Sequence, residues 1–193
     1  MKFHKNLGWF AFLAALLALT PGCDQPKSAG NPPAVSSATN APSAQQTAQQ
    51  AFEDMLPKQA QPQLPTIKVW VGAEELITEM ALTGPQQMTG MMWRTNMPEN
   101  TAMLFAHPTP RQAGYWMKNC YVPLSIAYID TDGAILEIHD MQPHDTNSVV
   151  SAAMNVRFAL ETPQGWFQRH HVSTGAVVRT ERGSLPETFL RRQ

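Results

Sequence analysis

The sequence has few cysteines, a net charge close to zero and no long apolar run, and each of these features excludes some classes of protein. The chain has two cysteines, Cys23 and Cys120, so it can form at most one internal disulfide. Its formal net charge of -1 argues against an extended nucleic-acid surface and against a polybasic membrane patch. No Gly-rich phosphate loop and no recognisable catalytic Ser/His/Asp order or carboxylate pair occurs. We therefore expect no nucleic-acid partner and lean against an enzyme.

The first 22 residues have the features of an export signal. A basic start at Lys2 and Lys5 precedes an apolar run over residues 7–19, which is shorter than the about 17–25 residues that cross a bilayer. The following "LTPGC" resembles a lipoprotein lipobox, in which Cys23 becomes the lipidated first residue, although Leu19 lies one position too early. Asp24 resembles a signal for inner-membrane retention. The alternative is ordinary cleavage, which leaves a soluble periplasmic protein with a free Cys23 thiol.

Composition divides the rest of the chain into three parts. Residues 23–63 are rich in Pro, Ser, Ala and Gln and have little apolar periodicity, which predicts a disordered linker with room for a short helix near residues 49–56. Residues 64–181 have the apolar patterns of a folded domain, and 43% hydrophobic residues in the whole chain allow a real core. Residues 182–193 read as a polar tail.

Within the domain, short alternating runs predict mainly strands. We expect strands in the ranges 67–71, 74–82, 101–107, 114–120, 124–130, 134–141, 155–161 and 175–180. Thr83 and Gln86 have capping-box spacing and predict one short helix, and Thr162 with Pro163 predicts a second. Asp132-Gly133 is a strong hairpin signal. The prediction is a compact, barrel-like α+β domain of seven or eight mainly antiparallel strands with two short helices.

Three blocks of sequence resemble the DUF192 family, also called UPF0127. They are "TGMMWRTNMPENTAMLF", "YWMKNCYVPLSIAYIDTDGAILEIHDMQP" and "VRFALETPQGWFQRHHVSTGAVV", and the resemblance covers about residues 66–180. It implies a compact barrel-like fold, often in exported bacterial proteins, and no established activity. Two positions depart from the family pattern: Cys120 replaces a threonine, which indicates a buried isosteric exchange rather than a catalytic thiol, and Ser125 replaces an aspartate. The second change argues against any family mechanism that uses that carboxylate.

The stretch "YWMKN" is the best candidate for a binding site. If residues 114–120 form a strand, Trp116 and Lys118 lie side by side on one face. An indole beside a positive donor suits a small anionic or sugar-like ligand. Asn119 adds a polar group, and the resemblance makes Arg94 a second cation. The alternative is that the lysine stem merely covers the tryptophan ring.

Metal sites are less well supported by the sequence. His139, Asp140, His144 and Asp145 match no defined ligand spacing, and the methionines of "QQMTGMMW" have the spacing of core-packing residues. Arg157 and Glu161 share one face of their strand and are expected to form a structural ion pair. We predict no metal and no cofactor.

Together these observations predict a lipid-anchored module on the periplasmic face of the inner membrane. Its partners would be the membrane, through the anchor, and a small anionic or sugar-like ligand or an envelope protein. The alternative is an envelope enzyme that acts on a small substrate through Lys118.

Overall fold

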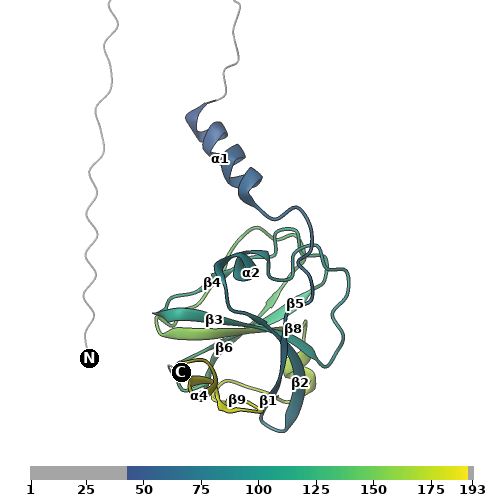
Figure 1. Ribbon diagram of the computed structural model, residues 1–193, viewed down its shortest axis with the longest axis vertical. Coiled ribbons are helices and arrows are strands. Elements are labelled where there is room, and N and C mark those ends of the chain that lie inside the picture. The colour runs from purple at the N-terminus through teal and green to yellow at the C-terminus, as the bar shows by residue number, and fades with distance from the viewer. Residues whose placement is uncertain (1–42, 191–193) are drawn as a thin grey trace, which may run out of the picture. The chain divides into compact units, whose positions relative to one another are not determined.

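The computed structural model describes residues 43–190 (Figure 1). The predicted signal peptide, Cys23 and the ends of the linker and tail lie outside these residues. The described part contains four helices and ten strands. In chain order they are α1 (Ala44–Met55), β1 (Thr66–Val71), β2 (Glu74–Ala81), α2 (Gly84–Thr89), β3 (Thr101–Arg111), β4 (Gly114–Tyr115), β5 (Leu124–Ile129), β6 (Ile135–Met141), β7 (Val149–Val150), β8 (Val156–Pro163), α3 (Trp166–Arg169), β9 (Val178–Thr180), β10 (Gly183–Ser184) and α4 (Leu185–Phe189).

Eight strands form one sheet in the order β10-β9-β1-β2-β3-β8-β5-β6, and β4 pairs with β7 separately. Neighbouring strands are antiparallel except β2 and β3, which are parallel and are connected through α2. A parallel pair needs such a crossover, whereas β5 and β6 are joined directly at the predicted Asp132-Gly133 turn. The sheet does not close, but an isolated bridge between Ala134 and Val177 brings the start of β6 against the chain just before β9.

The sheet carries apolar side chains on both faces. The inner strand β5 shows this most clearly, because all six of its residues are buried. Ile126 and Tyr128 belong to one core cluster with Phe105 and Met117, while Ile129 belongs to a second cluster with Trp166. Figure 1 shows α2 at one end of the domain and α4 at the other. The candidate site lies at the α2 end, beside the first cluster.

The predicted fold class is confirmed: the domain is α+β and mainly antiparallel. The segment predicted as a strand over residues 114–120 forms only the two residues of β4, followed by a turn at Lys118 and Asn119. The predicted cap at Thr162 is wrong, because Thr162 is a buried β8 residue paired with Ser125. Helix α3 begins later, after Gly165, whose φ of 74° suits glycine.

Two helices lie in segments that were predicted to be linker or tail. Helix α4 is capped by Ser184, and α1 begins with a capping box between Ser43 and Gln46. Residues after α1 already contact the domain: Leu56 is buried, and Gln61 Nε2 donates to the Gly90 carbonyl over 2.9 Å. Ordered contacts therefore begin ahead of residue 64.

Candidate functional site

The turn after β4 holds Trp116 and Lys118 together. The Met117 amide donates to the Asp145 carbonyl over 2.8 Å, and Asn119 has a φ of 59°, a left-handed conformation that asparagine tolerates. The Asn119 carbonyl accepts from the Trp93 amide over 2.7 Å. Lys118 Nζ lies 5.6 Å from the centroid of the Trp116 ring. Trp116 and Lys118 are therefore neighbours, as predicted. They are held together by a turn and not by the alternation of side chains along a strand.

The C-terminal part of α1 contacts this turn. Lys118 forms an ion pair with Glu53, and the Phe52 and Trp116 rings lie 6.0 Å apart between centroids. Lys118 is therefore occupied by a carboxylate of the same chain. The side chains of this pair are 18% and 32% exposed, so water screens the attraction.

A groove of about 320 Å³ lies between α1, α2, β3 and β4. It combines aromatic and thioether surfaces with several polar side chains. The lining residues are Phe52, Leu56, Gln87, Met88, His107, Arg111, Gly114, Tyr115 and Trp116.

Inside the groove, three side chains form a hydrogen-bonded series. Arg111 Nη2 lies 3.2 Å from His107 Nδ1, and His107 Nε2 lies 3.3 Å from the Tyr115 hydroxyl. A guanidinium can only donate, so Nδ1 accepts and the neutral ring carries its proton on Nε2. Burial, together with the charges of Arg111 and Arg157, lowers the pKa of His107 to about 4. The groove therefore carries the positive charge of Arg111 beside an uncharged His107 at neutral pH.

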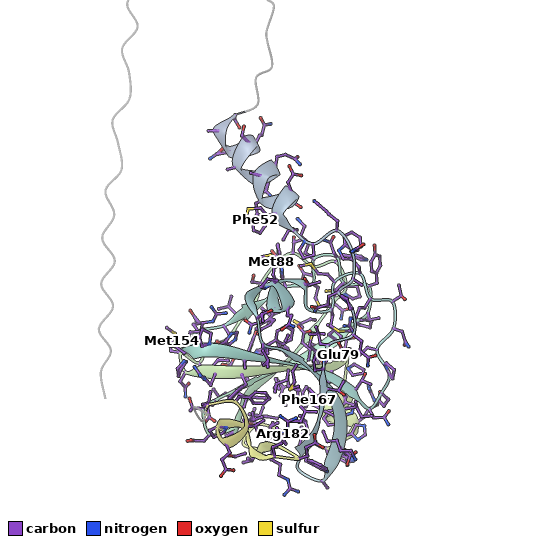
Figure 2. All side chains as sticks on the ribbon, viewed as in Figure 1. Phe52, Glu79, Met88, Met154, Phe167 and Arg182 are labelled. Atoms are coloured by element: carbon purple, nitrogen blue, oxygen red, sulfur yellow. The ribbon has the colours of Figure 1, made fainter. Side chains whose placement is uncertain are left out.

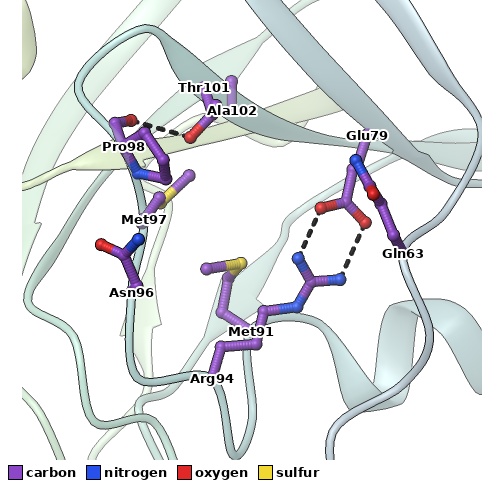
Figure 3. Close-up of a pocket in the computed structure, with 9 residues that line it drawn as sticks. All are labelled: Gln63, Glu79, Met91, Arg94, Asn96, Met97, Pro98, Thr101 and Ala102. Atoms are coloured by element: carbon purple, nitrogen blue, oxygen red, sulfur yellow. Dashed lines mark hydrogen bonds and ion pairs between the residues drawn. The ribbon is translucent and has the colours of Figure 1, made fainter.

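Arg94 lies in a different hollow, of about 280 Å³, which shares no lining residue with the groove. Figure 3 shows its guanidinium facing both carboxylate oxygens of Glu79. Glu79 also accepts the Leu64 amide over 2.7 Å. Burial alone would raise the pKa of Glu79, but the Arg94 hydrogen bonds, the Leu64 amide and the Arg94 charge outweigh it and lower the pKa. The structure thus separates Arg94 from Trp116 and Lys118 and places it in an ion pair.

A smaller inner cavity of about 40 Å³ adjoins the groove. Its lining residues are Gln87, Met88, Thr89, Gly90, Met91, Met92, Phe105, Tyr115, Trp116, Cys120 and Glu161. Cys120 is buried, as expected, and burial raises the pKa of its thiol to about 12. Burial also raises the pKa of Glu161 to about 8.

The predicted ion pair between Arg157 and Glu161 does not form. Arg157 Nε and Glu161 Oε2 are both buried without a hydrogen-bond partner among residues 43–190. The pairing prediction rested on two residues sharing a strand face, and a separation of four residues along an extended strand is about 13 Å, too far for direct contact.

His139 and Asp140, two of the residues considered as metal ligands, contact other side chains of the domain. His139 contacts Glu137, and Asp140 accepts from Ser125, which in turn accepts the Gly165 amide over 2.8 Å. Within the described part of the chain, no group of three or more His, Cys, Asp or Glu side chains is placed to hold a metal ion. No helix between residues 43 and 190 has the length and apolar character needed to cross a membrane.

Sequence reasoning missed Arg111, His107 and Glu161. The predicted strand ended at residue 107, but β3 continues to Arg111 and carries both His107 and Arg111 to the groove. Glu161 was noticed only as half of an ion pair. A charged residue at the end of the apolar strand "VRFAL" was the available signal.

The family model of DUF192, described as an uncharacterised ACR, matches residues 67–180. The chain belongs to the DUF192 family. No curated protein matches it. Two solved structures are similar to this DUF192 domain, each with a TM-score of 0.59. One is a candidate transcription regulator from Sinorhizobium meliloti 1021, with 30% identity over 63% of this chain and 98% of that one. The other is a protein of unknown function from Novosphingobium aromaticivorans DSM 12444, with 27% identity over 62% of this chain and 90% of that one.

Proposed function

We propose that this DUF192 protein is a binding module that holds a small anionic or sugar-like ligand in the groove beside Trp116. One observation carries the proposal. Arg111 lines the groove and forms no ion pair with a carboxylate among residues 43–190, whereas Lys118 and Arg94 are each paired with one. The positive group available to a ligand is therefore Arg111, which sequence reasoning did not select.

The other residues that line the groove suit a small cyclic or acidic ligand. Trp116, Tyr115 and Phe52 provide aromatic faces, and a volume of about 320 Å³ lies in the lower part of the range of about 300–1,000 Å³ for small-molecule sites. A guanidinium binds carboxylate or phosphate oxygens through charge-assisted hydrogen bonds. Apolar faces with one convergent cation are typical of such sites.

The alternative, an enzyme that uses Lys118, has less support. A catalytic lysine needs access to substrate and a second titratable group that assists it. Lys118 is not among the residues that line the groove, and its ammonium is paired with Glu53. The same pair brings α1 against the turn, so Lys118 fits better as an anchor for this helix.

Ligand binding can be tested by thermal unfolding of the full chain with inorganic phosphate, small dicarboxylates and neutral monosaccharides. A ligand at 100 times its Kd should add about 2.7 kcal/mol to the free energy of unfolding. We expect Arg111→Gln to abolish an anion-induced shift, whereas Arg182→Gln should retain it. Arg182 is the matched control because it is exposed and lies at the opposite end of the domain from Met88 (Figure 2). Equal loss of the anion-induced shift in both variants would indicate a nonspecific effect of charge. It would reject the groove as the binding site.

We also propose that the module is anchored by a lipid on Cys23 at the periplasmic face of the inner membrane. The support is the sequence alone: the basic start, the short apolar run, the cysteine in "LTPGC" and Asp24. Such an anchor would present the groove to small molecules or envelope proteins in the periplasm.

Fractionation tests the anchor. Cys23→Ser should release the protein from the membrane fraction or leave it unprocessed, and Asp24→Asn should alter its distribution between the inner and outer membranes. A Cys23→Ser protein that fractionates and migrates like the wild type would exclude lipidation. Cys120→Ser is the matched control, because Cys120 is buried in the folded domain.

A further inference from the structure

The inner cavity is lined by sulfur-containing residues from two separate parts of the chain. Met88 belongs to α2, Met91 and Met92 follow that helix, and Cys120 comes from the turn after β4. Helical spacing alone explained the methionines as core packing. It did not show that all three share one small cavity with the only cysteine of the described residues.

Glu161 gives independent evidence that the cavity is built for a ligand. Its side chain lines the cavity, the residue is 4% exposed, and Oε2 has no hydrogen-bond partner among residues 43–190. A buried polar atom without a partner is costly, so such atoms are uncommon in folded proteins. A bound cation in the cavity would supply the missing interaction.

We propose that this cavity binds one cuprous ion, with Cys120 and the thioethers of Met88 and Met92 as the donor set and Glu161 as the charge-compensating group. Thiolate and thioether groups are soft ligands, which suit Cu(I). Binding would release the thiol proton of Cys120 to solvent, because the thiolate is the ligand form. No electron is transferred, since the metal enters and remains as Cu(I).

Other occupants fit the donor set less well. Magnesium and calcium require mostly oxygen ligands, six or more in number, and the cavity offers one carboxyl group. Structural zinc sites use four Cys or His ligands, and the cavity contains one cysteine and no histidine. An organic ligand of ordinary size does not fit a volume of about 40 Å³, whereas a single ion does.

This proposal rests on different charged groups from the anion site, although Met88, Tyr115 and Trp116 line both spaces. Arg111 and His107 line the groove but not the inner cavity, and Cys120 and Glu161 line the inner cavity but not the groove. Arg111→Gln therefore tests the anion site alone, and Cys120→Ser tests the copper site alone.

The test is an anaerobic titration of the full chain with Cu(I) in competition with a coloured Cu(I) chelator. The chain carries Cys23→Ser, so that Cys120 is the only thiol. We expect one Cu(I) per chain. Cys120→Ser should weaken binding by roughly 100-fold or more, because it removes the anionic sulfur, and Met92→Leu and Glu161→Gln should each weaken it by about 10–100-fold. X-ray absorption of the loaded protein should show sulfur neighbours.

The matched control is Met154→Leu, because Met154 is 68% exposed and does not line the cavity. It should leave Cu(I) affinity unchanged. Thermal unfolding of each metal-free variant establishes that it is folded before its affinity is compared. The proposal is overturned if the Cys23→Ser chain does not take up Cu(I), or if folded Cys120→Ser and Met92→Leu variants bind it as tightly as their parent.

Discussion

Glu161→Gln should make the metal-free protein more stable than the wild type at pH 8 and above. Burial raises the pKa of Glu161 from 4.5 to about 8, so the folded state retains a proton that the unfolded state has lost between these two values. The stabilising contribution of the neutral acid is complete below about pH 4.5 and is lost as the pH rises through 8. The full shift corresponds to about 5 kcal/mol. Glutamine keeps the shape without the charge and should remove this loss.

The measurement is urea unfolding from pH 5 to 9 for wild type, Glu161→Gln and Glu75→Gln. Glu75 is an exposed β2 carboxylate in an ion pair with Lys68, and its variant should follow the wild-type profile. His107 has the opposite dependence, because its lowered pKa makes stability fall as the pH falls from 6.5 toward 4. The difference between wild type and Glu161→Gln cancels that contribution. A difference that does not change with pH would mean that Glu161 is ionised in the folded protein.

Arg94→Met should destabilise the domain by about 2–4 kcal/mol. The Arg94 and Glu79 side chains are 18% and 13% exposed, so loss of the guanidinium leaves a mostly buried carboxylate without its cation. Breaking a buried pair from one side typically costs about 3–5 kcal/mol, and partial exposure reduces that cost. The double variant Arg94→Met with Glu79→Gln should recover much of the loss, because it no longer buries an unpaired charge.

Urea unfolding of the two single variants and the double variant gives the coupling energy of the pair. This cycle also separates the two roles considered for Arg94. A structural partner costs stability when removed and leaves the anion-induced shift intact. If Arg94→Met kept wild-type stability and lost that shift, the ligand-binding role predicted from sequence would be correct and the pair interpretation wrong.

The fold was largely accessible from sequence because its signals are local. The Thr83 capping box forms as predicted, and Asp132-Gly133 joins β5 to β6 with Gly133 at a φ of 92°. The site was less accessible because its partners are distant in the chain. Glu53 reaches Lys118 across 65 residues, and Glu79 reaches Arg94 across 15. Sequence spacing does not predict such contacts, so Lys118 and Arg94 were both expected to be available to a ligand.

Glu161 and Arg111 are two residues whose place beside a cavity or groove was not predictable from local sequence patterns. Strand alternation placed Glu161 on a face but did not show that this face borders a cavity between α2 and the turn after β4. The prolines near residues 108–110 favoured a loop, whereas β3 continues through them as an exposed strand end, where a missing amide proton is tolerated. Tertiary context therefore decided which charges are available to a ligand.

The central claim is that a small anion binds in the groove beside Trp116 and Arg111. Tryptophan indole NMR signals test it most directly, because the chain has five tryptophans and Trp116 is the one among residues 43–190 that lines the groove. In a titration with the anion that gives the largest thermal shift, the Trp116 Nε1–H signal should move. The signals of Trp70, which lies on β1, and of Trp166, which is buried in the other core cluster, should stay in place. A stationary Trp116 signal while Trp70 or Trp166 moves would contradict the account.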